Sequence, residues 1–372
     1  MIKITALFFS LLVHVGGLFA QQKDSTIAKK DSATIEYSAY ADAYAAYYTD
    51  SVGVGNYQKF PSVSPLNSLG LNVAMITAKY SADRLRGVVT LHYGGIPLST
   101  WSSKYNFIQE ANVGIRLFKQ LWIDGGFFRT HIGAEGLFPK ENIASSISVC
   151  TYMEPYYEAG FKLSYSPSDR FALNFFALNG YNLFEDNNNK TSAGMLVTYA
   201  INDRLNVGYC NYIGDDSQMG DTISRMRIYN NVCINYQSKK IKIQFGGDYA
   251  VQQTEDPNDP AAMISGILSV RYQCYEKSAI YVRGEYFNDP NGFLSGTFTD
   301  DNGYLTGLKI LGVTAGAEYK PTTNSYIRLE GRMLQAGEAQ SIFRWNQKST
   351  NIRMEAMIHM GVYINQKKNI HS

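Results

Sequence analysis

The clearest chemical pattern in the sequence is a set of opposite charges that lie two positions apart. The members are Arg283 with Glu285, Arg328 with Glu330 and Arg332, and Arg353 with Glu355. Residues two apart on a β-strand point to the same face, so we expect these side chains to form a charged ladder. On a pore wall such a ladder would bias which solutes pass. Alternatively, the charges would neutralise one another across strands and stiffen the wall.

Other charged residues fall in the same phase on earlier segments. Together with the ladder, we predict that they line a wet interior; they are Arg84, Arg86, Glu110, Arg116, Asp124, Glu158 and Lys162. An Arg or Lys on a lipid-facing side would cost about 2–4 kcal/mol at the bilayer midplane, so the phase of the charges indicates the wet face. The chain has 34 basic and 32 acidic residues, which indicates neither an ion preference nor nucleic-acid binding.

Residues that could form a catalytic centre are sparse. An active site on a barrel would need its members to converge near the outer rim, and His131 with Glu135 is the one candidate pair there. His92 has no neighbouring nucleophile, and the chain contains no Gly-x-Ser-x-Gly pattern. We therefore expect neither an enzyme nor a bound cofactor.

The four cysteines, Cys150, Cys210, Cys233 and Cys274, form no Cys-x-x-Cys pair, and no metal site is expected from them. Cys210 and Cys233 flank a loop centred near 221–222 at similar distances and share an inferred face. In an oxidising compartment they could form a cross-strand disulfide or stay as free thiols, and the sequence leaves both open.

The segments that hold these side chains are predicted to be β-strands, because apolar and polar residues alternate with a period of two from Ile35 onward. Between 35 and 47 the odd positions are Ile, Tyr and Ala, whereas Glu36, Ser38 and Asp42 are among the even ones. A soluble β-sandwich has the same period. Alternation alone therefore does not decide the fold.

The lengths of the connections separate the two folds. Short connections at 81–84, 118–120, 166–170, 201–204, 238–240, 275–278 and 320–325 alternate with long ones at 50–68, 97–104, 133–155, 182–191, 214–224, 253–262, 288–306 and 336–350. Periplasmic turns of an outer-membrane barrel are tight, while its outer loops are free to grow. We therefore predict an all-β, antiparallel, up-and-down transmembrane β-barrel of about sixteen strands, with both termini in the periplasm.

The remaining segments and the composition agree with export to a membrane. Residues 1–20 combine Lys3, a short apolar run and small residues near Ala20, which predicts a cleaved Sec-type signal peptide; a membrane anchor is the alternative. We expect a flexible periplasmic lead-in at 21–34, the barrel at 35–364 and a tail at 365–372. The mean hydropathy of -0.22 is too polar for a helical membrane protein but suits strands that are apolar on alternate residues.

Three stretches have a more specific pattern. They are the run of IQEAN, LW, DGG and HIG at 108–133, EPYYEAGFKL at 154–163 and ALNGYN at 177–182. These stretches resemble the β-barrel porin-2 family of OmpL-like outer-membrane proteins, which is frequent in Bacteroidetes. The resemblance implies an outer-membrane barrel with a pore function and supplies no catalytic residues. One departure is the C-terminus, where QKKNIHS follows Ile364 in place of a terminal aromatic residue.

We therefore expect a porin-like channel in the outer membrane of a Gram-negative bacterium, through which small hydrophilic solutes diffuse. An occluded barrel whose outer loops recognise a partner is the alternative. By analogy with porins whose third outer loop folds inward, Glu135, Lys140 and Glu141 would line a constriction. Expected partners are outer-membrane lipid and lipopolysaccharide, the outer-membrane assembly machinery and small solutes. A homo-oligomer is conceivable, and nucleic acid is not expected.

Overall fold

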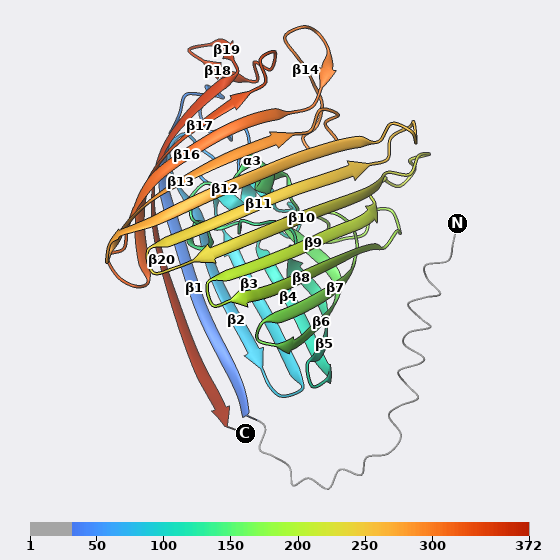
Figure 1. Ribbon diagram of the computed structural model, residues 1–372, viewed down its shortest axis with the longest axis vertical. Coiled ribbons are helices and arrows are strands. Elements are labelled where there is room, and N and C mark those ends of the chain that lie inside the picture. Colours follow the sequence, from blue (N-terminus) through green and yellow to red (C-terminus); the bar gives the residue numbers. More distant parts are fainter. Residues whose placement is uncertain (1–31, 372) are drawn as a thin grey trace.

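The computed structural model describes residues 32–371, in which sixteen antiparallel strands close into one barrel (Figure 1). The barrel strands are β1 (Ser32–Tyr48), β2 (Leu69–Ser81), β3 (Leu85–Tyr93), β4 (Ile108–Phe118), β5 (Leu121–Arg129), β6 (Tyr157–Ser168), β7 (Phe171–Leu178), β8 (Ser192–Asn202), β9 (Leu205–Asp215), β10 (Met226–Gln237), β11 (Ile241–Gln252), β12 (Ala261–Tyr275), β13 (Ser278–Asn288), β16 (Lys309–Tyr319), β17 (Ser325–Ala336) and β20 (Ile352–His371). β1 pairs with both β2 and β20, so the first and last strands lie side by side and leave no open sheet edge.

The alternation of side chains sorts each strand into an apolar outer face and a polar inner face. In β17, the side chain of Leu329 is 62% exposed, whereas its neighbours Arg328 and Glu330 are buried. The same holds in β3, where Val89 and Leu91 are exposed on either side of the buried Thr90. The faces predicted from the period of two are therefore confirmed. A barrel with this apolar outside can lie in lipid while its polar groups face inward.

The short and long connections also alternate as predicted. Seven short turns, such as 82–84 and 238–240, lie at the end of the barrel that holds the C-terminus, and eight long loops lie at the opposite end. The sixteen-strand prediction and the placement of all short turns at one end are confirmed.

The ends of the barrel differ from the predicted bounds of 35 and 364. β1 begins at Ser32 and β20 continues to His371, with residue pairs running from Ser32 and His371 to Tyr48 and Glu355. Residues 365–371, expected to be a tail, are thus the end of the last strand. Strand pairing needs backbone hydrogen bonds and not apolar side chains, so the polar end of the chain can extend the ladder. The predicted signal peptide at 1–20 and residues 21–31 of the predicted lead-in lie outside the described residues.

The long loops carry the remaining secondary structure. These elements are the helices α2 (Gly95–Thr100) and α3 (Val149–Met153), the 3-10 turn η2 (Pro139–Glu141), and the hairpins β14 (Phe298–Thr299) with β15 (Leu305–Thr306) and β18 (Phe343–Trp345) with β19 (Lys348–Thr350). No helix in the described part of the chain is long and apolar enough to cross a membrane. Residues 130–156, which connect β5 to β6, form the lumen loop, and this loop holds η2 and α3.

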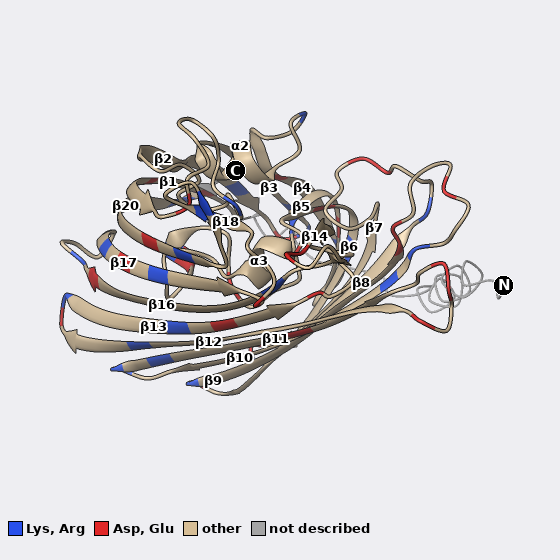
Figure 2. Cartoon of the chain, turned by 90° about the horizontal axis from the view of Figure 1, so that it is seen from above, with Lys and Arg blue, Asp and Glu red and all other residues tan. Residues whose placement is uncertain are grey.

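The lumen loop lies inside the ring of strands. Figure 2 looks down on the molecule and shows α3 surrounded by the wall, with bands of Lys, Arg, Asp and Glu on the strands. One apolar cluster packs Val149 of α3 with Met263 and Leu334, and a second packs Phe138 with Tyr40. The core of this protein is therefore the layer between the inward loops and the inner face of the barrel wall.

Candidate functional site

The predicted charged ladder lies on the inner faces of β13, β17 and β20, where five of its seven members pair with one another: Arg283, Glu285, Arg332, Arg353 and Glu355. Arg332 donates two hydrogen bonds to Glu285, both of 3.0 Å, and Arg353 donates to Glu355 at 2.6 and 2.9 Å. A longer contact of 3.7 Å joins Arg332 to Glu355. Two-pronged Arg–carboxylate pairs are strong and directional. Of the two alternatives considered for the ladder, its internal contacts match mutual neutralisation across strands.

The carboxylates of this wall also hold the lumen loop by its backbone. Glu330 accepts hydrogen bonds from the amides of Ser145 and Ser146 at 2.7 and 3.1 Å. Glu285 accepts one from the amide of Val149, at the start of α3, at 2.7 Å. Buried backbone amides need such partners, because each one left unpaired inside the barrel would cost about 1–3 kcal/mol.

The arginines of the wall complete the attachment by donating to loop carbonyls. Arg328 donates to the carbonyl of Pro139 at 2.7 Å, and its Nε donates to Glu318 at 2.8 Å. Arg283, which is fully buried, donates to the carbonyl of Ser146 at 2.5 Å. The wall thus presents acceptors to loop amides and donors to loop carbonyls, and this combination sets the position of the loop.

The three residues predicted to line a constriction have different surroundings. Glu135 is buried, where it accepts hydrogen bonds from Arg283 at 2.9 Å and from the amide of Ser148 at 2.8 Å. Its carboxylate is thus turned toward the wall. Lys140 lies 4.3 Å from the centre of the Tyr40 ring and is half-buried.

The third of these residues, Glu141, is exposed and accepts two hydrogen bonds from Arg129. The loop therefore presents Lys140 and Glu141, but not Glu135, to solvent.

The opposite side of the barrel carries a second group of the predicted residues. Arg86, Glu110, Asp124 and Lys162 line one cavity of about 200 Å³ on the inner faces of β3 to β6. Arg86 Nε donates to Asp124 at 2.6 Å, and Lys162 lies 3.8 Å from the same carboxylate. This cavity brings together four residues that the sequence places on separate strands.

Two predicted lining residues lie near the turns. Arg116 is near the end of β4, and its side chain donates to Asp83 in the turn 82–84 at 2.7 Å. Arg84 lies in that same turn and is exposed, so it belongs to no barrel strand. The alternation of residues predicted that Arg84 faces inward. Arg84 is the residue before β3 begins, however, so it lies in the turn and not on the strand.

His131 does not pair with Glu135 as the sequence suggested. Its Nδ1 lies 2.7 Å from Glu158 of β6, and its Nε2 lies 2.8 Å from the carbonyl of Asn211. Both ring nitrogens face acceptors, so both carry protons in this arrangement. Although burial by itself would lower it, the neighbouring Glu158 carboxylate raises the pKa of His131 above its ordinary value. The pair holds the start of the lumen loop.

The cysteines are all free within the described residues. Cys210 is opposite Asn231 in the strand register, and Cys233 is opposite Gly208, so the two thiols are offset by two positions. Cys210 and Cys233 therefore form no disulfide in this structure, and both are free thiols.

One polar cluster on the inner wall was not predicted from the sequence. Asp42 accepts hydrogen bonds from Asn72 at 2.6 Å and from the Tyr326 hydroxyl at 2.5 Å, and His359 Nδ1 lies 3.3 Å from it. Asp42, Tyr326 and His359 have the inward phase of their strands, and Asn72 lies at the irregularity of β2 between the residues that pair with Asp42 and Ala43. Their meeting follows from closure of the barrel between β1 and β20, which brings the two ends of the chain together.

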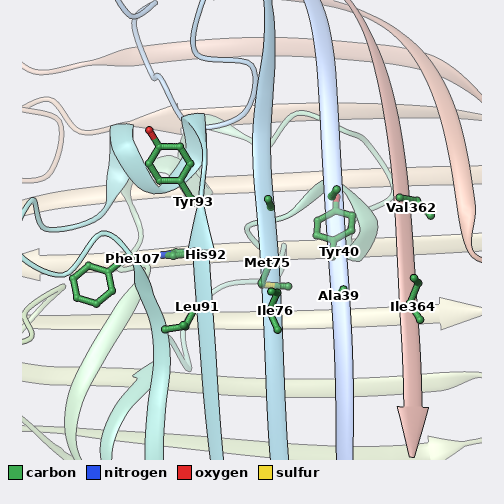
Figure 3. A pocket seen from close by; sticks show the side chains of 12 residues that line it. Ala39, Tyr40, Met75, Ile76, Leu91, His92, Tyr93, Phe107, Val362 and Ile364 are labelled. Carbon is green, nitrogen blue, oxygen red and sulfur yellow. The ribbon is translucent and has the colours of Figure 1, made fainter.

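A shallow groove on the outside of the wall has a different character. Figure 3 shows Ile76, Leu91, Val362 and Ile364 around the small residue Ala39. These apolar side chains are exposed on the lipid-facing side. The groove therefore belongs to the membrane-facing surface and not to the lumen.

Comparisons with known proteins agree with this geometry. The family model described as "Putative beta-barrel porin-2, OmpL-like" matches residues 34–362, and no curated protein matches the sequence significantly. OmpT of Vibrio cholerae is similar in structure, with a TM-score of 0.54 at 15% identity over 91% of this chain and 100% of that chain.

Two further solved structures have the same fold. The outer membrane channel DcaP of Acinetobacter baumannii has a TM-score of 0.60 at 10% identity, over 92% of this chain and 100% of that chain. OmpF of Salmonella typhi, in a complex with daunomycin, has a TM-score of 0.57 at 12% identity, over 89% of this chain and 97% of that chain. At these identities the likeness is one of fold, while the family match covers nearly the whole described chain. The chain belongs to this β-barrel porin-2, OmpL-like family and is a porin-like barrel of the cell outer membrane.

Proposed function

We propose that this barrel is a non-enzymatic channel for passive diffusion of small hydrophilic solutes, narrowed by the lumen loop. The proposal rests on the hydrogen bonds by which Glu330, Glu285 and Arg328 hold the backbone of that loop inside the barrel. A loop held by both its amides and its carbonyls keeps one position, and a constriction needs a fixed position to select by size.

The part of the wall away from the loop supports a wet passage. Thr198 and Asn206 have the inward phase of β8 and β9 and are exposed, and Lys242 of β11 is partly exposed. These residues lie toward the periplasmic ends of their strands. Polar side chains that line accessible space favour hydrated solutes over apolar ones.

A cleft at the outer end supports an entry route. It has a volume of about 580 Å³ and is lined by Phe60, Tyr152, Phe298 and Ile342, among others. These residues come from four different outer loops, including the lumen loop. We propose that solutes reach the constriction through this cleft.

The proposal also includes the surroundings of the barrel. The apolar outer face suits outer-membrane lipid and the acyl chains of lipopolysaccharide. Insertion would depend on the outer-membrane assembly machinery, which recognises barrel strands. One solved structure of OmpT of Vibrio cholerae is described as a trimer form, which is compatible with a homo-oligomer of this chain.

The test is conductance of the refolded mature protein in planar bilayers. We expect discrete open-channel steps, and vesicles that contain the protein should swell in small sugars but not in large ones. Protein that has been heat-denatured before reconstitution is the control. Absence of steps from correctly folded barrels would contradict the channel and favour the alternative, an occluded barrel whose outer loops bind a partner.

A further inference from the structure

Three side chains of metal-ligating type meet between the lumen loop and β11. One ligand atom from each of Cys150, Glu154 and Asp248 lies within 4.8 Å of the others, and all three residues are buried. Cys150 and Glu154 are four positions apart across α3, so both face the same way. The Cys150 thiol donates to Asp248 Oδ2 at 2.9 Å and lies 3.6 Å from Glu154 Oε1.

The carboxylates of this cluster differ from several buried acids of the wall and the loop. Glu285, Glu318 and Glu135 each have an arginine partner. Within the described residues, Glu154 and Asp248 form no ion pair with any Lys, Arg or His. Burying carboxylates without a cation is costly, and such groups usually take up protons or bind a metal ion. Burial, together with the nearby Asp248 carboxylate, raises the pKa values of both Cys150 and Glu154 well above their ordinary values.

A second feature points to a ligand at this place. The Tyr229 hydroxyl is fully buried; it makes no hydrogen bond of 3.5 Å or less to any described residue, and its longer-range contact is with the Asp248 carboxylate. Tyr229 is opposite Ala250 in the strand register and Asn231 is opposite Asp248, so Tyr229 is the diagonal neighbour of Asp248 on the inner face. Its hydroxyl lies near Asp248 and Cys150. An unpaired buried hydroxyl costs about 1–3 kcal/mol, which a bound ion or its water would offset.

We propose that Cys150, Glu154 and Asp248 bind one divalent metal ion of the zinc type, with the Tyr229 hydroxyl facing the open coordination position. A thiolate together with carboxylates suits Zn²⁺, whereas Ca²⁺ and Mg²⁺ prefer oxygen ligands alone. The site belongs to the lumen loop and the wall, and it does not depend on the channel activity proposed above.

The spacing of the ligands fits such an ion. Bonds of about 2.3 Å to sulfur and 2.1 Å to oxygen at a tetrahedral angle place the two ligand atoms roughly 3.6 Å apart. The separation of Cys150 Sγ and Glu154 Oε1 is 3.6 Å. The contact between Cys150 and Asp248 is a hydrogen bond of 2.9 Å, and it would open by roughly 0.7 Å when the thiol proton leaves.

Metal binding would replace protons and tie the loop to the wall. The Cys150 thiol and the Glu154 carboxyl would each release a proton to solvent as the ion binds. Ser265 lies 2.7 Å from the Cys150 sulfur and donates to Asp248 at 3.0 Å, so it would orient both ligands. The ion would thus join α3 to β11, a wall strand outside the charged ladder.

The test uses the full mature chain, refolded in detergent micelles, and reads metal binding directly. After incubation with Zn²⁺ and gel filtration, we expect one equivalent of zinc to remain with the wild type. Cys150→Ser and Asp248→Asn should lose at least nine-tenths of it. Cys274→Ser is the matched control, because Cys274 is a partly exposed thiol on β12 and should leave binding unchanged.

Cobalt gives a second, spectroscopic readout. Co²⁺ bound to the native chain should show a thiolate-to-cobalt charge-transfer band, and this band should be absent in Cys150→Ser. Zinc retained equally by wild type and Cys150→Ser, or Co²⁺ binding without the band, would overturn the proposal. If a variant fails to fold, as judged by heat-modifiable mobility on gels, the cobalt spectrum of the native chain still decides the question. A barrel that binds metal but does not conduct would contradict the channel and leave this site standing.

Discussion

Glu330 accepts a hydrogen bond of 2.7 Å from the backbone amide of Ser145, although the two residues are 185 positions apart in the chain. The neighbouring amide of Ser146 donates to the other oxygen of the same carboxylate. One side chain on the barrel wall therefore holds two consecutive amides of the lumen loop. These hydrogen bonds attach the loop to the wall, and the contribution of each residue to the attachment can be tested by a single substitution.

Glu330→Gln should loosen the lumen loop, because an amide oxygen can no longer accept from both backbone groups as a carboxylate does. Hydrogen bonds to charged groups contribute about 1.5–3 kcal/mol, so we expect a loss of this size in the free energy of unfolding in urea. Bilayer currents should become noisier. Glu276→Gln, an exposed acid in the turn between β12 and β13, is the matched control, and an equal effect of both changes would refute the attachment.

Replacing residues 133–155 by a short Gly/Ser turn should raise the single-channel conductance. The barrel should still close, because Arg129 and Tyr157 are register partners and a tight turn can join strands at that point. Circular dichroism would check the β content, and planar bilayers the conductance. An unchanged conductance in the folded deletion variant would show that the loop is not the constriction.

Arg283→Gln should be strongly destabilising, since it leaves Glu135 without its arginine partner inside the barrel. Breaking one side of a buried pair costs about 3–5 kcal/mol. The double variant Arg283→Gln with Glu135→Gln should recover part of this loss, because no unpaired carboxylate remains at that place. Urea unfolding of the four proteins of the cycle measures the coupling, and strictly additive effects would argue against it.

Lys162→Glu should shift the ion preference of the channel toward cations. Lys162 is partly exposed and lines the cavity that also contains Arg86 and Glu110. Reversing its charge makes the local potential more negative, which attracts cations. The reversal potential in a KCl gradient is the measurement, with Lys239→Glu in the exposed turn 238–240 as the control. The same reversal potential for Lys162→Glu and wild type would place Lys162 off the permeation path.

The His131–Glu158 pair should make stability depend on pH. Burial opposes the charged imidazole, but the Glu158 carboxylate raises the pKa of His131 in the folded protein. A raised histidine pKa adds stability below the unfolded value of about 6.5, and this contribution is lost as pH rises through the folded pKa. The difference in unfolding free energy between wild type and His131→Gln should therefore be largest near pH 5–6 and smaller in alkaline buffer. A difference that does not change with pH would show that the ring is neutral.

The periodicity of the sequence was enough to predict the wall of this barrel. Successive residues of a strand alternate between its two faces, and a charge that faces lipid is costly. The positions of the charged residues therefore indicate which side chains face the lumen and which face lipid. Arg328, Glu330 and Arg332 were assigned to the inner face on this ground, and they lie there. The alternation of short turns and long loops depends only on local segments, and it predicted sixteen strands.

The path of the lumen loop could not be predicted in the same way. Its position depends on contacts such as Glu330 with Ser145 and Arg328 with Pro139, in which the partners lie on segments far apart in the chain. A period of two predicts the face of the strand on which a side chain lies. It does not predict the height of that side chain along the barrel axis or its position around the ring. For this reason Glu135 was expected at the constriction, while its carboxylate is turned toward Arg283.

Local patterns and the cost of charge in lipid were thus enough to predict the strands, their faces and the end of the barrel at which each connection lies. Which inward side chains meet depends instead on the folded arrangement of the whole chain. Asp42 with His359, His131 with Glu158, and Cys150 with Asp248 come together because the closed ring and the inward loop bring distant segments to one place. Spacing along the chain carries no record of such distances. In the candidate metal site it relates Cys150 to Glu154, but neither of them to Asp248.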